Sequence, residues 1–139
     1  MLSKFNLADK MFHRPPMLLV DKIISSESAK GTTEFAVPSD CIFLDENGLF
    51  SRAAMVEVAA QSFAAHDIYQ KTLKKSKVSK GFLVSARSFV FFSDAQKGDK
   101  LVCRLEKTDE IAKLHMLLAE ILKNGEVIAS GELRIFEIE

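Results

Sequence analysis

The sequence predicts an α+β fold in which an antiparallel β-sheet wraps around one long central helix. Residues 51–73 contain no Gly or Pro and are rich in Ala, Met, Val and Gln, which predicts a helix of more than five turns. About six other runs are rich in branched and aromatic residues, and turn residues separate most of them. A sheet has to bury one face, and this helix is apolar enough to be what the sheet covers.

Two strands are predicted before the helix. The Pro15-Pro16 pair precedes a branched run at 17–29, which predicts a strand that starts from a turn. A second strand pattern begins after Gly31. Residues 32–37 alternate polar and apolar side chains, so we expect the return strand of a hairpin. Residues 39–50 are rich in acidic and turn residues and predict a loop before the helix.

Four more strands are predicted after the helix. The run that follows Gly81 is too aromatic and branched for a surface helix, and Asn124-Gly125 is a strong hairpin signal between two apolar runs. Residues 113–122 would suit a helix by propensity, but this turn and its branched partner run favour a strand. The predicted strands are 81–92, 101–107, 113–122 and 127–136.

Length and charge restrict the class of protein. The 139 residues fit one domain, 1–139, with 19 Lys and Arg against 19 Asp and Glu. A net charge of zero argues against broad attraction to nucleic acid. No apolar run approaches the roughly 18 residues of a membrane span, and the first ten residues have no apolar signal core. We therefore expect a cytoplasmic protein that binds neither nucleic acid nor membrane.

Cysteine and aromatic usage add two expectations. Cys41 and Cys103 lack the spacing of a zinc site or a redox motif, so we expect small buried residues and neither a metal nor a cofactor. The aromatic residues are 11 Phe, one Tyr and no Trp, so nearly all ring surface lacks a polar group. This surface belongs in a core, an interface or an apolar ligand site. Candidates are Phe63, Phe82, Phe89, Phe91 and Phe92.

Four segments, in the same order along nearly the whole chain, resemble the hotdog-fold 3-hydroxyacyl-acyl carrier protein (ACP) dehydratases of fatty-acid synthesis. Within that family, the segment from Ser39 to His66 is most similar to the dehydratase-like proteins of aryl polyene clusters. The resemblance implies a single hotdog domain, an obligate homodimer or heterodimer with a related dehydratase, and an acyl tunnel at the dimer interface. The four segments are HRPPMLLVDK at 13–22, VEVAAQ at 56–61, residues 91–101, and NGEVIASGEL at 124–133.

The resemblance also implies a catalytic pair, a histidine from the loop before the helix and a carboxylate on the helix. Glu57 matches the carboxylate, but Phe43 stands where the histidine is expected. Dehydration needs a base for the C2 proton, an acid for the leaving hydroxyl and donors for the enolate-like oxygen. Glu57 would therefore act alone or with a new partner, unless it is only a buried acid that fixes the loop.

The remaining polar candidates have open roles. His13 matches a position usually taken as structural, His66 is predicted on the opposite helical face from Glu57, and no role is assigned to His115. Gln61 is expected to orient other groups, and the residues expected to contact substrate are Gln61, Gly48, Phe43 and His13. Gly48 either brings loop amides to a thioester carbonyl or serves a turn.

Three functions follow as alternatives. The first is a 3-hydroxyacyl-ACP or CoA dehydratase of fatty-acid or polyene biosynthesis, with Glu57 central. The second is a silent subunit that binds an acyl chain or completes a heterodimer, which the replacement by Phe43 favours. The third is a hotdog acyl thioesterase in which Glu57 activates water.

Overall fold

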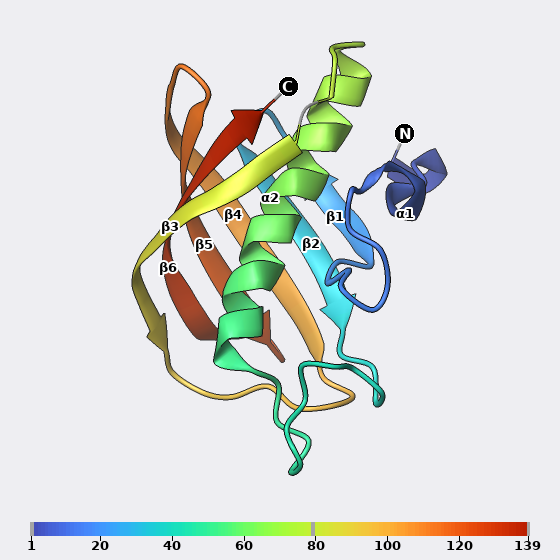
Figure 1. The fold of residues 1–139 in the computed structure, drawn as a ribbon, viewed down its shortest axis with the longest axis vertical. Coiled ribbons are helices and arrows are strands. Elements are labelled where there is room, and N and C mark those ends of the chain that lie inside the picture. The colour runs from blue at the N-terminus through green and yellow to red at the C-terminus, as the bar shows by residue number, and fades with distance from the viewer. Residues whose placement is uncertain (1, 79, 139) are drawn as a thin grey trace.

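Six strands form one antiparallel sheet that curls around a long helix in the computed structural model, which describes residues 2–78 and 80–138 (Figure 1). The side chains of Ser3 and Phe82 lie outside the described part of the structure. The prediction that the Phe82 ring belongs to a core, an interface or a ligand site therefore stays a prediction. Two short helices, Leu2–Lys4 and Leu7–Lys10, come first and were not predicted. The order is then strand, strand, long helix and four strands, as the sequence predicts. The predicted α+β class is confirmed.

The elements follow the predicted runs closely. Their bounds are η1 Leu2–Lys4, α1 Leu7–Lys10, β1 Lys22–Ser26, β2 Lys30–Ala36, α2 Arg52–Leu73, β3 Lys80–Phe91, β4 Lys100–Ile111, β5 Leu114–Lys123 and β6 Glu126–Ile138. β1 begins later than the predicted residue 17, because the backbone of Met17 and Leu19 bonds to a side chain of α2 instead of to a strand. β4 runs on to Ile111, which pairs with Leu114 across a tight turn.

The strand order places β3 at one edge of the sheet. The order is β1-β2-β4-β5-β6-β3, so β3 pairs with β6 and the chain crosses the sheet through α2 between β2 and β3. Asn124 and Gly125 both have positive φ, 52° and 79°, which is the geometry of the tight hairpin turn that their sequence predicts.

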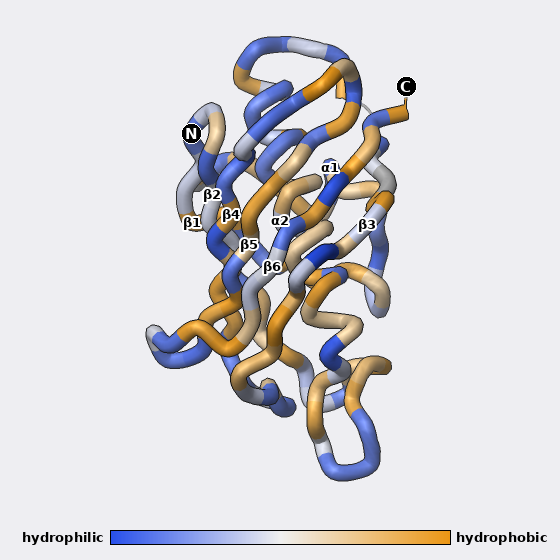
Figure 2. The backbone as a smooth tube through the Cα atoms, turned by 90° about the vertical axis from the view of Figure 1, so that its left-hand side faces the viewer, coloured by the Kyte–Doolittle hydropathy of each residue, from blue (hydrophilic) through white to orange (hydrophobic). Residues whose placement is uncertain are grey.

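The core lies between the inner face of the sheet and α2. Hydrophilic and hydrophobic residues alternate along much of the sheet (Figure 2), so one face carries most of the apolar side chains. The inner face contributes fully buried side chains such as Leu101, Ile121 and Leu133, and α2 contributes Met55 and Ala59. None of the helices in the described ranges is long and apolar enough to cross a membrane.

β3 has apolar side chains on both of its faces. Phe89 and Phe91 pack against the core, with ring centroids 5.6 Å apart. On the other face, Val90 and Phe92, the residue that follows the strand, are 48% and 64% exposed. Alternation along an extended chain places these two pairs on opposite faces. A strand that is both an unpaired edge and apolar on its outer side is suited to pairing with another chain.

Candidate functional site

Glu57 lies in the second turn of α2, on a stripe that runs along the helix. Ser51 caps the helix by accepting a hydrogen bond from the amide of Ala54 at 3.3 Å, so α2 begins at Arg52. From Glu57 the i+3 and i+4 spacing leads through Ala60 and Ala64 along the same face. The Glu57 side chain is 40% exposed, so it is not the buried acid that an apolar helix face suggests.

The segment before β1 folds against this stripe and brings His13 to it. The Arg14 guanidinium donates to the carbonyl groups of Met11, Ala8 and His13. The Arg14 carbonyl in turn accepts from the amides of Met17 and Leu18, at 2.8 and 3.1 Å. Arg14 thus holds a compact turn, and the turn fixes the position of the neighbouring His13.

Gln61 connects the same segment to Glu57. Its Oε1 accepts from the Leu19 amide at 2.7 Å, and its Nε2 donates to the Met17 carbonyl at 2.9 Å and to Glu57 Oε1 at 3.3 Å. The side chain is 2% exposed. Because the backbone bonds fix both ends of the amide, Gln61 can donate to Glu57 but cannot accept from it. Gln61 therefore positions the Glu57 carboxyl.

His13 and Glu57 form a pair. His13 Nε2 lies 3.7 Å from Glu57 Oε1, and the two side chains are 34% and 40% exposed. His13 Nδ1 is buried and has no hydrogen-bond partner among the described residues. An imidazole next to a carboxyl group at this distance supplies two groups that can exchange protons with a ligand placed between them. The sequence alone did not predict this role for His13.

A pocket of about 260 Å³ opens from this pair and runs between α2, β3 and β6. His13, Glu57 and Gln61 form one end of its lining. The wall beyond them is largely apolar. It includes Ala60, Phe63, Ala64, Ile68, Leu83 and Ile135, and the charged residues that also line the pocket are Asp67, Lys80 and Glu137.

Asp67 and Glu137 belong to an ion network at the far end of the pocket. Lys71 Nζ lies 2.8 Å from Asp67 Oδ2 and also bonds to Glu137 Oε1. Burial raises the pKa of Asp67. Burial acts the same way on Glu137, but hydrogen bonds from Lys71, Asp67 and His115 outweigh it and lower the pKa to about 2. The i, i+4 spacing of Asp67 and Lys71 is the signal in the sequence that could have indicated part of this network.

Phe43 and Gly48 lie in the loop before α2 and do not line this pocket. The Phe43 carbonyl accepts from the Ser51 amide at 2.9 Å, and the ring packs against the core. Gly48 has φ +80°, and its amide donates to the Asp45 carbonyl at 3.0 Å. Gly48 thus serves a turn, while a role of either residue in binding substrate stays a prediction.

The other two histidines lie away from Glu57. His66 Nδ1 is 2.7 Å from Ser26 Oγ, and burial lowers the pKa of His66 to about 4. His115 lies on β5 between two carboxylates, with Nδ1 3.3 Å from Glu110 and Nε2 3.3 Å from Glu137. Neither lines the pocket beside Glu57, which agrees with the predicted placement of His66 on another face of the helix.

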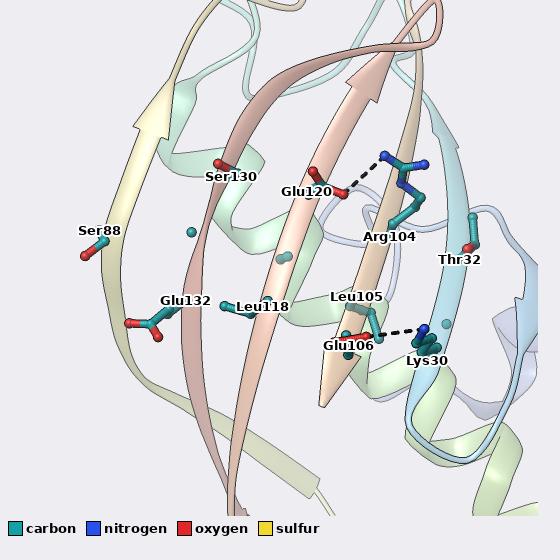
Figure 3. Close-up of a pocket in the computed structure, with 13 residues that line it drawn as sticks. Lys30, Thr32, Ser88, Arg104, Leu105, Glu106, Leu118, Glu120, Ser130 and Glu132 are labelled. Carbon is teal, nitrogen blue, oxygen red and sulfur yellow. Dashed lines mark hydrogen bonds and ion pairs between the residues drawn. The ribbon is translucent and has the colours of Figure 1, made fainter. Parts of the chain in front are cut away.

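A larger hollow, of about 810 Å³, lies on the outer face of the sheet, away from α2 (Figure 3). Four of its five charged side chains, all except Glu132, pair with each other across the strands. Lys30 lies 3.4 Å from Glu106, and Arg104 lies 3.2 Å from Glu120. Among the residues that the structure describes, the lining of this hollow contains no histidine and no cysteine. This hollow therefore offers no histidine beside a carboxylate, and the pocket at Glu57, which has such a pair, is the candidate site.

A curled antiparallel sheet around a central helix, with a carboxylate of that helix at the mouth of an apolar pocket, defines a hotdog-fold protein. The expected hotdog fold is confirmed by solved structures that share it. The chain belongs to the ApeP-like family, described as ApeP dehydratase, whose model matches residues 5–139. It is thus a dehydratase-like hotdog protein, and the family expected from the sequence is confirmed. No curated protein sequence matches the chain.

Three solved structures illustrate the similarity. The dehydratase heterocomplex ApeI:P from Xenorhabdus doucetiae is 20% identical, with a TM-score of 0.90 over 98% of this chain and 93% of that one. A hypothetical thioesterase with coenzyme A from Streptococcus pneumoniae is 12% identical, with a TM-score of 0.67 over 84% and 86%. A variant of the phenylacetic acid degradation protein PaaI from Thermus thermophilus is 16% identical, with a TM-score of 0.64 over 84% and 92%.

Proposed function

We propose that the chain catalyses the loss of water from a 3-hydroxyacyl thioester, with Glu57 and His13 as its acid–base pair. The observation that carries the proposal is the 3.7 Å separation of His13 Nε2 and Glu57 Oε1 at the mouth of an apolar pocket. Membership in a dehydratase family supports the reaction type. His13 takes the place of the loop histidine, whose position Phe43 occupies.

The proposed step uses each group once. Neutral His13 removes a proton from C2 of the acyl chain, and the protonated Glu57 carboxyl donates its proton to the hydroxyl group on C3. The C3–O bond breaks, water leaves, and a double bond forms between C2 and C3. The step leaves an imidazolium and a carboxylate, which attract each other at this distance. A proton then returns from His13 to Glu57, directly or through the water, and restores the pair.

The pocket beyond the pair suits the acyl part of the substrate. Its wall is formed by small and apolar side chains of α2 and by β3 and β6, so it favours a hydrocarbon chain. The thioester end would lie at the Glu57 mouth and carry either ACP or coenzyme A. In the cell we place this reaction in fatty-acid or polyene synthesis in the cytoplasm.

We further propose that the chain works as a dimer, and that a heterodimer with a related dehydratase is the principal form. The similar ApeI:P structure is a dehydratase heterocomplex, which supports this assembly. The unpaired edge of β3, with exposed Val84, Val90 and Phe92 side chains, is the part of the chain best suited to pairing. A homodimer through the same edge is the alternative.

A second candidate function is a silent subunit that binds an acyl chain or completes an active partner. The observation that favours it is Phe43, because the catalytic loop histidine of the resemblance is missing. In this case Glu57 and His13 would hold each other without taking part in a reaction. The two candidates differ in whether activity depends on Glu57.

The test supplies a 3-hydroxyacyl pantetheine thioester to the chain alone and to the chain mixed with a related dehydratase. The enoyl product is followed by its ultraviolet absorbance, and free thiol is measured in the same samples. The proposal expects enoyl formation that depends on Glu57 and no release of thiol. Thiol release without enoyl product would instead indicate a thioesterase. Activity of the mixture that is the same with Glu57→Gln would indicate a silent subunit.

A further inference from the structure

The pocket at Glu57 ends at a wall that separates it from a second cavity. The second cavity has a volume of about 220 Å³ and lies toward the C-terminal end of α2. Phe63, Asp67 and Glu137 line both cavities, so these side chains are their shared wall. Lys71 lines the second cavity and forms ion pairs with both carboxylates from that side of the wall. The ion pairs therefore close a passage that would otherwise continue along the helix.

The wall is charged, while the pocket in front of it is mostly apolar. The side chains of Asp67 and Glu137 are only 16% and 14% exposed, and Lys71 is 19% exposed. Separating such partly buried partners would leave charges without compensation in a region of low polarity. An alkyl chain end offers nothing to replace those contacts. The three side chains thus resist an apolar group that would pass between them.

The distance from the reacting end to the wall corresponds to a defined chain length. Glu57 and Asp67 are ten residues apart on α2, about 15 Å along the axis, which is the span of an extended chain of roughly ten to twelve carbons. Ala64 lies between them on the same side of the helix and leaves the passage open. The ion pairs of Asp67 and Glu137 therefore mark the point beyond which a longer acyl chain does not fit.

We propose that Asp67, Lys71 and Glu137, together with Phe63, form the end wall that limits the length of the acyl chain. This inference rests on the proposed function in one respect, that the pocket holds an acyl chain. Asp67 and Glu137 are then residues that determine specificity and do not touch the reacting carbons. Replacing the two acids with Ala joins the first cavity to the second.

The experiment measures binding of saturated acyl pantetheine thioesters of increasing length by calorimetry, in the assembly that the chain forms in solution. Saturated chains cannot be dehydrated, and the Glu57→Gln background is used so that hydrolysis of the thioester does not affect the result either. Each carbon within the pocket should tighten binding by about fourfold, from the free energy of burying one methylene group. We expect this gain to stop near twelve carbons in the parent and to continue by several carbons in the Asp67→Ala/Glu137→Ala variant.

Two further variants make the result specific to the wall. Glu110→Gln changes the same ion network but lines only the second cavity, so the length limit should stay where it is. Ala64→Leu narrows the pocket before the wall, so the limit should move to shorter chains. The Ala64→Leu result does not require the wall variant to fold. An affinity that rises steadily past sixteen carbons in the parent, or a limit that Ala64→Leu leaves unchanged, would overturn the proposal.

The outcome can be separated from that of the proposed reaction. A length limit that moves as expected in a protein without dehydratase activity supports the wall and contradicts the reaction. Dehydratase activity together with a limit that Asp67→Ala/Glu137→Ala does not move, in a variant that melts as a folded protein, supports the reaction and contradicts the wall.

Discussion

His13 Nε2 lies 3.7 Å from Glu57 Oε1, although His13 precedes β1 and Glu57 lies within α2, with β1 and β2 between them in the sequence. The turn that Arg14 stabilises and the bonds from Gln61 to Met17 and Leu19 produce this proximity. Glu57 therefore has a histidine neighbour within its own chain, although the loop before α2 has Phe43 at the expected position.

Replacing His13 should reduce turnover more than binding. Loss of one acid–base group typically lowers a rate by about 10²–10⁴-fold, so His13→Asn should lower kcat by at least 10²-fold and change KM little. Steady-state kinetics of enoyl thioester hydration measure both constants, and thermal melts verify that the variant is folded. A folded His13→Asn variant with normal kcat would show that the histidine is only structural.

Gln61→Leu should reduce both stability and turnover. The Leu19 amide loses its partner in a buried position, and an unsatisfied buried group costs about 1–3 kcal/mol. The Glu57 carboxyl also loses the donor at 3.3 Å, so kcat should fall although Gln61 touches no reacting atom. Urea unfolding and steady-state kinetics test the two effects. Stability within about 0.5 kcal/mol of the wild type would contradict the role assigned to Gln61.

Stability should fall as the pH drops from about 6.5 toward 4. The pKa of His66 is about 4 in the folded protein, while the ordinary value is 6.5, so in this window the unfolded chain binds a proton that the folded chain does not. The total loss is roughly 3 kcal/mol. Glu137, whose pKa is lowered from the ordinary 4.5 to about 2, adds its own loss of stability between about pH 4.5 and pH 2, so its contribution begins only at the lower end of this window.

Urea unfolding at pH 4.5 and pH 7.5 measures this loss, with His66→Gln as the comparison. The variant should start from lower stability, because Ser26 loses its imidazole partner, and should show a smaller difference between the two pH values. The same difference in both proteins would mean that groups other than His66 cause the pH dependence.

Gly131→Ala should destabilise the sheet. A Cβ at this position would lie 2.7 Å from the Phe89 Cα, and a backbone atom on the paired strand cannot move aside easily. Overpacking of this kind typically costs about 1–3 kcal/mol. Ser130→Ala, at the neighbouring residue, is the control and should stay within about 0.5 kcal/mol. Thermal melts of the two variants that coincide would contradict the close contact.

The fold was predictable because its signals are local. The absence of Gly and Pro predicts α2, and Asn124-Gly125 predicts the hairpin of β5 and β6. The strand order was not predictable in the same way. β3 pairs with β6 across the whole C-terminal half of the chain, and no local pattern records such a partner. The late start of β1 has the same origin, because a side chain of the helix takes the backbone bonds of Met17 and Leu19.

The candidate site was predicted only in part. Glu57 and Gln61 were found through the family resemblance and lie together. His13 was expected to be structural or to contact substrate. Its place beside Glu57 was not predicted, because nothing in the sequence records that the Arg14 turn carries it there. The end wall needs Glu137 of the last strand beside Asp67 of the helix, which is a contact that only the closed sheet produces.

The central claim, that Glu57 is the acid of a dehydration reaction, is tested most directly by the hydration of an enoyl thioester. The rates of the wild type and Glu57→Gln are compared in the same assembly, with thermal melts to verify that both are folded. The Gln side chain keeps the size of Glu57 but cannot exchange a proton, so the account predicts a rate at least 10²-fold lower. Equal rates in the two proteins would contradict it.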